Sequence, residues 1–336
     1  MNRRALLRLA FAGALLAAVP ATSAQVLAEP VKLRVNYSVV PPHLVPVFYT
    51  KKELIKHEGK SYTPQFIFTN SSGIVMQAMA AKEMDLGVLT VPAFANGIQN
   101  AKQPLVAIGD LTQDGPWFSA IFAVKAESPI KTVKDLKGKS IATNGIGGGL
   151  DGAVRAMLLK NGLKPDVDVQ IVDANFAAME AMLREGKVDV ATFAAPFWAR
   201  AQAKGGVRTL FTMKDAIGDN QHLFWVARRD VLDRHKAALV DFFEDYLRAH
   251  RWFVDPKNRT EAFDLIAKFA KQPAANFDWE LREGTGYFRG KDLRLDRAVF
   301  QRTADALFEV GFLKTKFDTA PHIDESIIIE AAKRLQ

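Results

Sequence analysis

The sequence contains no cysteine among its 336 residues. This absence excludes a disulfide framework, a thiolate nucleophile and any metal site that depends on cysteine ligands. It also excludes a lipid anchor on an N-terminal cysteine. An exported form of this chain would therefore be retained only in a compartment bounded by two membranes, such as a Gram-negative periplasm.

Other signatures of chemistry are absent as well. The chain has no Gly-x-Ser-x-Gly elbow and no phosphate loop with lysine and serine or threonine. None of the six histidines has a second histidine four positions away, which is the spacing of a helical metal site. No dense run of lysine and arginine indicates a nucleic-acid track. We therefore predict a protein that is not an enzyme, with no cofactor, no metal and no nucleic-acid partner.

The N-terminus has the order of a secretory signal. Arg3 and Arg4 form a short basic head, Ala5 to Val19 form an apolar stretch, and small residues lead to Ala24. This order predicts a signal peptide over residues 1–24, cleaved near Ala24. The paired arginines fit either the general secretory pathway or the twin-arginine pathway. Cleavage would lower the net charge from +8 to +5, because three arginines and no acidic residue leave with the signal.

No second long apolar run follows, so we expect the mature chain to be soluble. About 310 residues exceed the usual range of a single core, so two domains are expected. Strand and helix patterns alternate, which favours the α/β class with mainly parallel strands. The predicted strands are Val31 to Tyr37, Gln65 to Thr69, Leu86 to Thr90, Leu105 to Ile108, Phe118 to Val124, Ser140 to Asn144, Asp168 to Val172, Val188 to Phe193 and Leu223 to Ala227.

Helical patterns separate the strands and dominate the tail. A helix is predicted over Leu44 to Ile55, with Pro46 in its first turn. After Asp230 only helical spacing remains, and Gly284 to Gly290 is the loosest loop of this layer. We predict that lobe I comprises residues 25–116 and 225–336, and that lobe II comprises residues 117–224.

Two stretches echo each other. Met79 to Val88 (MAAKEMDLGV) and Met182 to Ala191 (MLREGKVDVA) both run from a helix end through an acidic residue into a strand. Asp85 and Asp189 occupy matching places in them. Duplication of one lobe would explain the echo, and so would a generic junction between helix and strand. Both explanations stay open.

Several motifs identify a family resemblance. They are Ile130 to Ala142 (IKTVKDLKGKSIA), MAAKEMDLGV, Leu158 to Val172 (LLKNGLKPDVDVQIV) and Glu185 to Pro196 (EGKVDVATFAAP). Together they resemble the nitrate, sulfonate and taurine binding proteins of ABC importers, whose relatives include binders of thiamine precursors. The resemblance covers most of Val31 to Asp230. Two departures are Lys82, where the family often has glycine, and Asn144 to Gly149, where many members have serine or threonine.

The resemblance implies a fold and a function. The expected fold is the two-lobed periplasmic binding protein fold (type II-like), each lobe a mixed, mainly parallel sheet flanked by helices, with a helical C-terminal segment. The expected function is the substrate-binding subunit of an ABC importer, a monomer in the periplasm that captures a small organic anion between its lobes. Its partners would be the permease and ATPase subunits of the inner membrane.

The ligand site is expected in the loops that follow the strands, because ligands bind outside the carboxyl ends of strands in open α/β sheets. The glycine run before Asp151 can present backbone N–H groups to an anion at a helix start. Asp151 either caps that helix or selects a ligand with a positive group. The candidate ligand-binding residues are Ser38, Pro42, His43, Asn70, Ser71, Thr90, Val91, Trp117, Asn144, Gly147, Gly148, Pro196, Phe197 and Trp198.

The ligand's chemistry stays open at this point. Trp117, Phe197 and Trp198 would suit a sulfonate or carboxylate with an aromatic or apolar body, while His43 could donate to its acidic head. His222 would lie at a hinge, and the other histidines would lie on the surface. The alternatives are a binder of a thiamine-pyrimidine precursor, a related enzyme, or a periplasmic ligand-sensing module. The related enzymes rely on a cysteine-rich motif that this chain lacks.

Overall fold

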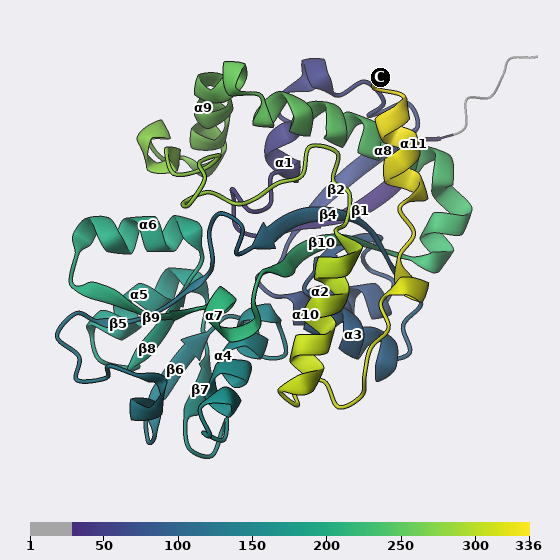
Figure 1. Cartoon of the computed structure of the whole chain (residues 1–336). Coiled ribbons are helices and arrows are strands. Elements are labelled where there is room, and N and C mark those ends of the chain that lie inside the picture. The colour runs from purple at the N-terminus through teal and green to yellow at the C-terminus, as the bar shows by residue number, and fades with distance from the viewer. Residues whose placement is uncertain (1–28) are drawn as a thin grey trace, which may run out of the picture.

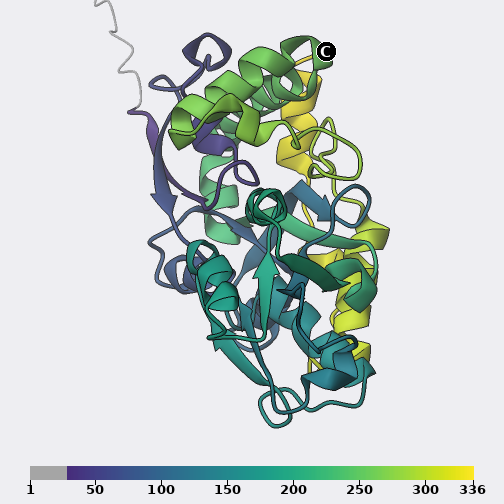
Figure 2. The same cartoon turned by 90° about the vertical axis from the view of Figure 1, so that its left-hand side faces the viewer.

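The computed structural model describes residues 29–336. The predicted signal peptide therefore lies outside the described residues. Two five-stranded sheets form the framework, and each is flanked by helices (Figure 1). The predicted fold class is confirmed. We call the first sheet and its helices lobe I and the second sheet and its helices lobe II. In Figure 2 lobe II lies toward the viewer, in front of the lower part of lobe I.

The sheet of lobe I has the strand order β2-β1-β3-β10-β4. β1 pairs in parallel with β2 and β3, whereas β10 pairs antiparallel with β3 and β4. Side chains along each strand alternate between the two faces of the sheet, and both the central strand β3 and the outer strand β4 are buried on both faces. Their bounds are β1 (Val31–Tyr37), β2 (Tyr62–Phe68), β3 (Leu86–Leu89), β4 (Leu105–Asp114) and β10 (Asn220–Arg228).

The sheet of lobe II repeats this plan, with the order β7-β6-β8-β5-β9. β6 pairs in parallel with β7 and β8, and β5 pairs antiparallel with β8 and β9. Each lobe thus carries three parallel strands followed by an antiparallel strand and an outer one. The bounds are β5 (Ile121–Lys125), β6 (Ser140–Thr143), β7 (Gln170–Asp173), β8 (Val190–Phe193) and β9 (Val207–Thr212).

The chain passes between the sheets after β4 and again before β10. The first crossing is fastened by Asp114, whose carboxylate accepts from Ser119 Oγ at 2.6 Å and from Ala120 N at 2.8 Å. The second crossing leads from β9 through the short helix α7 into β10, which begins at Asn220. The predicted division of the chain at residues 117 and 225 stays a prediction.

Helices cover both faces of each sheet. In lobe I, α8 and α11 pack on one face with Trp225, Phe242 and Tyr246 in the core, and α3 and α10 pack on the other with Phe94 and Phe300. The lobe I helices are α1 (Val45–Phe48), α2 (Ser72–Ala80), α3 (Val91–Gln99), α8 (Arg229–Val254), α9 (Arg259–Ala270), α10 (Arg297–Glu309) and α11 (Ser326–Lys333). The lobe II helices are α4 (Gly149–Lys160), α5 (Phe176–Arg184) and α6 (Ala195–Lys204), with α7 (Met213–Ile217) at the crossing.

One apolar cluster continues from lobe I into lobe II. It contains Phe94 of α3 and Leu307 of α10 together with Val154 and Met157 of α4. At Gly152 of α4 an added Cβ would lie 3.1 Å from Leu307 Cδ2, so the two helices approach closely there. We call this contact the α4 seam.

Several local predictions need correction. The helix predicted over Leu44 to Ile55 ends at Phe48, and a 3₁₀ turn follows at Lys52–Leu54. Pro196 and Trp198, interpreted as loop residues, lie in the first turn of α6, where proline is tolerated because its missing N–H has no helical partner. Pro92 likewise opens α3, which the sequence analysis did not predict. Within residues 29–336, no helix has both the length and the apolar character needed to cross a membrane.

The two echoing aspartates have the same structural role. Asp85 Oδ2 accepts from Arg34 N of β1 at 3.0 Å, and Asp189 Oδ2 accepts from Ser140 N of β6 at 2.9 Å. Asp85 thereby joins the start of β3 to β1, and Asp189 joins the start of β8 to β6. In each sheet the strand so reached is the middle one of the three parallel strands. The sequence echo marks equivalent positions of two lobes with the same topology.

We expect Asp85→Ala to destabilise the protein more than Asp189→Ala. Asp85 also pairs with Arg34 Nη2 at 2.8 Å and faces the buried Arg228 at 3.4 Å, so its loss leaves a buried charge short of a partner. The expected loss in the free energy of unfolding is about 3 kcal/mol for Asp85→Ala and about 1 kcal/mol for Asp189→Ala. Urea denaturation of both variants measures this difference. Equal losses would contradict the role given to Arg228.

Candidate functional site

A cavity of about 90 Å³ lies between the lobes, at the carboxyl ends of the parallel strands. Lobe I contributes the loops after β1, β2 and β3, and lobe II contributes the loop after β6 and the start of α5. Asn36, at the end of β1, ties three of these segments together. Its amide donates to Thr69 Oγ1 at 2.6 Å, and its oxygen accepts from Val88 N at 3.2 Å.

Most of the predicted binding residues meet in this cavity. Those that line it are Ser38, Pro42, His43, Asn70, Ser71, Thr90, Asn144 and Gly148. They come together because each follows the carboxyl end of a strand, or begins the helix after one. The lining also includes residues that were not among the candidate ligand-binding residues, for example Asn36, Thr69, Ser72, Phe176, Tyr287 and His222, which was expected at a hinge.

The remaining predicted residues lie outside the cavity lining. Gly147 donates its N–H to Asp151 Oδ2 at 2.8 Å, so this N–H already has a partner. Trp117 packs edge-on against Phe288, with 5.6 Å between the ring centroids. Val91 is the first residue of α3, and Pro196, Phe197 and Trp198 belong to the first turn of α6. A binding role for these residues stays a prediction.

Four helices begin at the cavity. Their N-cap residues, Ser71 of α2, Thr90 of α3, Gly148 of α4 and Ala194 of α6, all line it. The caps of α3 and α4 make no side-chain hydrogen bond to the first turn, which leaves backbone N–H groups for another acceptor. In α6 the N–H of Ala195 already donates to the Tyr287 hydroxyl, and Pro196 has no N–H. Each helix start carries a partial positive charge. These helix starts therefore contribute positive potential to a cavity whose described lining has no lysine or arginine.

No aspartate, glutamate, lysine or arginine is among the described residues that line the cavity. Of its two histidines, His43 is buried and His222 is half-buried. Burial, with the Arg289 and His222 charges as further causes, lowers the pKa of His43 to about 3. Burial also lowers the pKa of His222 to about 4. Both imidazoles are neutral at pH 7, and each can donate one N–H and accept one hydrogen bond.

Asp151 acts as part of the helix start. Its carboxylate accepts from Gly147 N and, at 2.9 Å, from Arg155 Nε one turn along α4. The side chain is 1% exposed and does not line the cavity. Asp151 therefore joins the loop before α4 to the first turn of the helix, and a role in ligand selection stays a prediction.

Tyr287 reaches the cavity from the C-terminal segment, in the stretch that the sequence predicted to be the loosest loop. Its hydroxyl accepts from Ala195 N, at the start of α6, at 3.1 Å. Both this ring and its neighbour Arg289 are buried. No periodic pattern in the sequence marks the segment, so local reasoning could not have found this residue.

A buried ion pair holds this segment in place. Arg289 Nε donates to Glu280 Oε1 at 3.1 Å, and the two side chains are 1% and 0% exposed. The guanidinium also donates to the carbonyl oxygens of Pro41 at 2.6 Å and Pro42 at 3.3 Å. It therefore joins the C-terminal segment to the loop that carries Pro42 and His43. We call this arrangement the Arg289 clamp.

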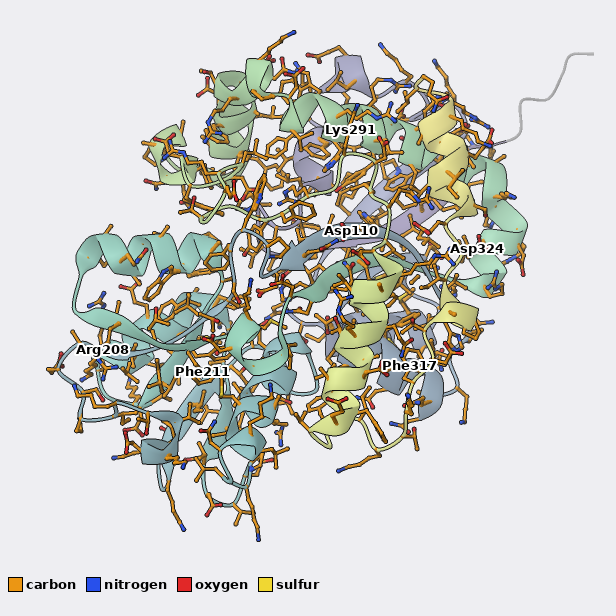
Figure 3. The ribbon with its side chains drawn as sticks, viewed as in Figure 1. Asp110, Arg208, Phe211, Lys291, Phe317 and Asp324 are labelled. Carbon is orange, nitrogen blue, oxygen red and sulfur yellow. The ribbon has the colours of Figure 1, made fainter. Side chains whose placement is uncertain are left out.

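Asp110 lies near the clamp, on the strand that leads toward lobe II (Figure 3). Its Oδ1 accepts from Gln221 Nε2 at 2.6 Å, and the side chain is 0% exposed. Burial raises the pKa of Asp110 to about 7, against the opposing effects of Gln221 and Arg289. This carboxyl is thus partly protonated at neutral pH.

His250 was expected on the surface, and this prediction was wrong. The residue is 0% exposed, lies parallel to the Tyr246 ring and contacts Gly290 O through Nε2 at 2.9 Å. The sequence carried a signal, because Phe243, Tyr246 and His250 have the i, i+3, i+7 spacing of the buried face of α8.

His57, Asp241 and Glu244 bring three potential metal ligands within 4.8 Å of one another. The carboxylates, however, already have cationic partners. Arg334 pairs with Asp241 at 2.7 Å, and Arg248 pairs with Glu244. The cluster reads as a surface ion-pair network.

Comparison with known proteins gives a consistent picture. The sequence model of the NMT1-like family matches residues 28–267. An aliphatic sulfonates-binding protein of Escherichia coli strain K12 is 27% identical over 274 residues, which cover 81% of each chain.

Two solved structures share the fold. The alkanesulfonate-binding protein SsuA of Xanthomonas axonopodis pv. citri, bound to MOPS, superposes with a TM-score of 0.70 at 20% identity, covering 88% of this chain and 99% of its own. The periplasmic nitrate-binding protein NrtA of Synechocystis PCC 6803 superposes with a TM-score of 0.70 at 15% identity, covering 92% and 90%.

Replacement of Arg289, the arginine of the clamp, should strongly destabilise the folded protein. Arg289→Met leaves Glu280 buried without its partner, so we expect the free energy of unfolding to fall by about 3–5 kcal/mol. The double variant Arg289→Met with Glu280→Leu buries no charge at either position and should lose less. Chemical denaturation of the single and double variants measures both effects. A double variant as unstable as Arg289→Met would mean that the proline carbonyl contacts, and not the charge of Glu280, dominate.

Asp110→Asn should change how stability depends on pH. An aspartate titrates near pH 3.9 in the unfolded chain, whereas in the folded protein the pKa of Asp110 is raised to about 7. Between these values the folded state holds a proton that the unfolded state has lost, so this group's contribution to stability falls as pH rises. The variant should therefore gain stability relative to the wild type between about pH 4 and pH 7, with no further gain above that. Thermal unfolding across this range tests it, and a constant difference would contradict the assignment.

Proposed function

The chain belongs to the NMT1-like family, and from this premise we propose that it is the periplasmic substrate-binding subunit of an ABC importer for a small organic anion. The proposed ligand carries a sulfonate or a carboxylate. The observation that supports it best is the convergence of four helix starts on one cavity with no acidic lining residue. Helix ends with a partial positive charge favour an anion.

The acidic head would be held by neutral donors. Ser71 and Thr90 offer hydroxyl groups, and Asn70 and Asn144 offer amides. The first turns of α3 and α4 offer backbone N–H groups, because no side chain caps them. A sulfonate has three oxygens and a carboxylate two, and each oxygen accepts more than one hydrogen bond. This set of donors therefore suits either group.

The rest of the lining suits a carbon body. Val39, Val75 and Leu223 from lobe I and Leu150 and Phe176 from lobe II bring apolar surface to the cavity. Such surface has no partner in a small inorganic anion, but it favours an organic one through burial of apolar area. The three similar proteins reported above are named for binding aliphatic sulfonates, alkanesulfonates or nitrate. Of these ligands, the apolar lining favours the sulfonates, which carry a carbon body.

We propose that the ligand favours a closed arrangement of the lobes. Contacts between the lobes are tight beside the cavity, where a Cβ added to Gly149 would lie 3.0 Å from Thr90 Cγ2. A ligand that touches both lobes stabilises the state in which they meet. The permease and ATPase of an inner-membrane importer would recognise that state, with the binding protein acting as a monomer.

Thr90→Val should weaken binding selectively. The change keeps the side-chain shape and removes a hydroxyl that lines the cavity. A hydrogen bond to a charged group contributes about 1.5–3 kcal/mol, so we expect the dissociation constant for ethanesulfonate to rise at least about tenfold. Thr112→Val is the matched control, since Thr112 is equally buried but lies in β4 away from the lining. Calorimetric titration measures both, and equal effects would contradict a role for Thr90.

The transport role has its own test. Cells that lack this protein should accumulate less radiolabelled ligand than wild-type cells, and restoring the wild-type chain should restore uptake. Restoring the Thr90→Val variant should rescue uptake less well at low ligand concentration. Normal uptake in the deleted strain, together with tight binding by the purified protein, would favour a sensing role over import.

A further inference from the structure

A second cavity lies next to the candidate site, between α6 and the C-terminal segment. Its volume is about 300 Å³, against about 90 Å³ for the candidate site. The rings of Phe118, Trp198 and Trp279 line it, together with Ala195, Gln202 and Thr285. No acidic or basic side chain is among its described lining residues. We call it the aromatic cavity.

Tyr287 forms the wall between the two cavities. It lines the candidate site, and its hydroxyl accepts from Ala195 N, while Ala195 lines the aromatic cavity and its neighbour Ala194 lines the candidate site. The Tyr287 ring meets Phe118 edge-on at 5.8 Å and Trp279 at 6.0 Å, measured between centroids. Both of those rings belong to the aromatic cavity. Tyr287 therefore lines one cavity and contacts the lining of the other.

The aromatic cavity suits a flat apolar group. Trp279 donates its indole N–H to Asn276 O at 2.8 Å, so its polar edge already has a partner. Trp198 and Trp279 are both partly exposed to solvent. Aromatic side chains that are partly open to a concave space favour contact with another ring. A cavity without charged groups offers no counter-ion for an acidic head.

The wall lies between a fixed point and an exposed turn. Arg289, two residues after Tyr287, is held by the clamp, whereas Arg282 to Thr285 are exposed. Gly284 has a φ of +84°, a conformation that glycine adopts without strain. One neutral hydrogen bond, from Ala195 N, joins the Tyr287 hydroxyl to α6. Tyr287 is therefore joined to α6 by a single hydrogen bond and lies between the clamp and an exposed turn.

We propose that the aromatic cavity receives the ring of a two-part ligand whose sulfonate or carboxylate lies in the candidate site, and that Tyr287 controls access of the ring. This inference rests on the proposed function, because it takes the acidic head to be bound between the lobes. It identifies the ligand class as arylalkyl sulfonates or carboxylates. Small alkyl anions would occupy the candidate site alone.

The first experiment compares two probes by calorimetric titration of the mature chain. Ethanesulfonate supplies only the head, and 3-phenylpropane-1-sulfonate supplies the head and a ring. We expect the wild type to bind the phenyl probe at least about tenfold more tightly. Trp279→Leu should remove most of this preference and leave ethanesulfonate binding within about twofold. Trp252→Leu is the control, a partly exposed tryptophan that lines neither cavity.

The outcomes separate the two proposals. The role proposed for the aromatic cavity would be overturned if both probes bound with equal dissociation constants, or if the preference survived Trp279→Leu. Either result would leave the proposed function standing. Failure of both probes to bind the wild type would overturn the proposed function for sulfonates and this inference with it. A preference lost in Trp279→Leu and kept in Trp252→Leu would support the inference.

A second pair of variants tests the wall. Tyr287→Ala joins the two cavities, so it should weaken ethanesulfonate binding, which loses contact with the ring, and raise the preference for the phenyl probe further. Tyr287→Phe keeps the ring and removes only the hydroxyl, so its preference should stay within about threefold of the wild type. An unchanged preference in Tyr287→Ala would contradict the role given to Tyr287.

Discussion

The buried pair of Arg289 and Glu280 fixes the geometry on which the candidate site depends. Burying two charges is costly, and the cost is offset only when geometry and further hydrogen bonds are good. Here the carbonyls of Pro41 and Pro42 supply those further bonds. The result is that a segment near the end of the chain is joined to the loop after the first strand. His43 and Tyr287, which lie beside the two ends of this connection, thereby come to line one cavity.

The two lobes contribute to the site in the same way because they share one topology. In each, parallel strands deliver the chain to the cavity edge, and a helix starts there with its amide groups directed inward. For the proposed anion, charge selection would come from backbone dipoles, since no lysine or arginine is among the described lining residues. Dipoles that are fixed by helices need no reorganisation when an anion enters, and they leave no bare cation when it departs. That arrangement suits reversible capture.

The sequence predicted the parts that follow local rules. Alternating strand and helix patterns, together with the family motifs, predicted the fold, and the loops after the strands contained Ser38, Asn70, Thr90 and Asn144, which now line one cavity. Tyr287 could not be predicted in this way, because its position depends on a contact between residues 248 apart, Arg289 and Pro41. The proline at the start of α6 was interpreted as a loop signal, although proline is equally at home in the first turn of a helix. Burial of His250 was predictable from helical spacing, but its residue type favoured the surface.

The α4 seam gives the molecule an asymmetric mechanical character. On that side Leu307 packs so close to Gly152 that parting the lobes would expose a continuous apolar core to water. On the side of α6, the connection runs through the Tyr287 segment, part of which faces solvent. A force that separates the lobes would therefore part them first on the side of α6, where the connection is weaker. Under the proposed function, a ligand would enter and leave on the side of α6, while the α4 seam keeps the two lobes in contact.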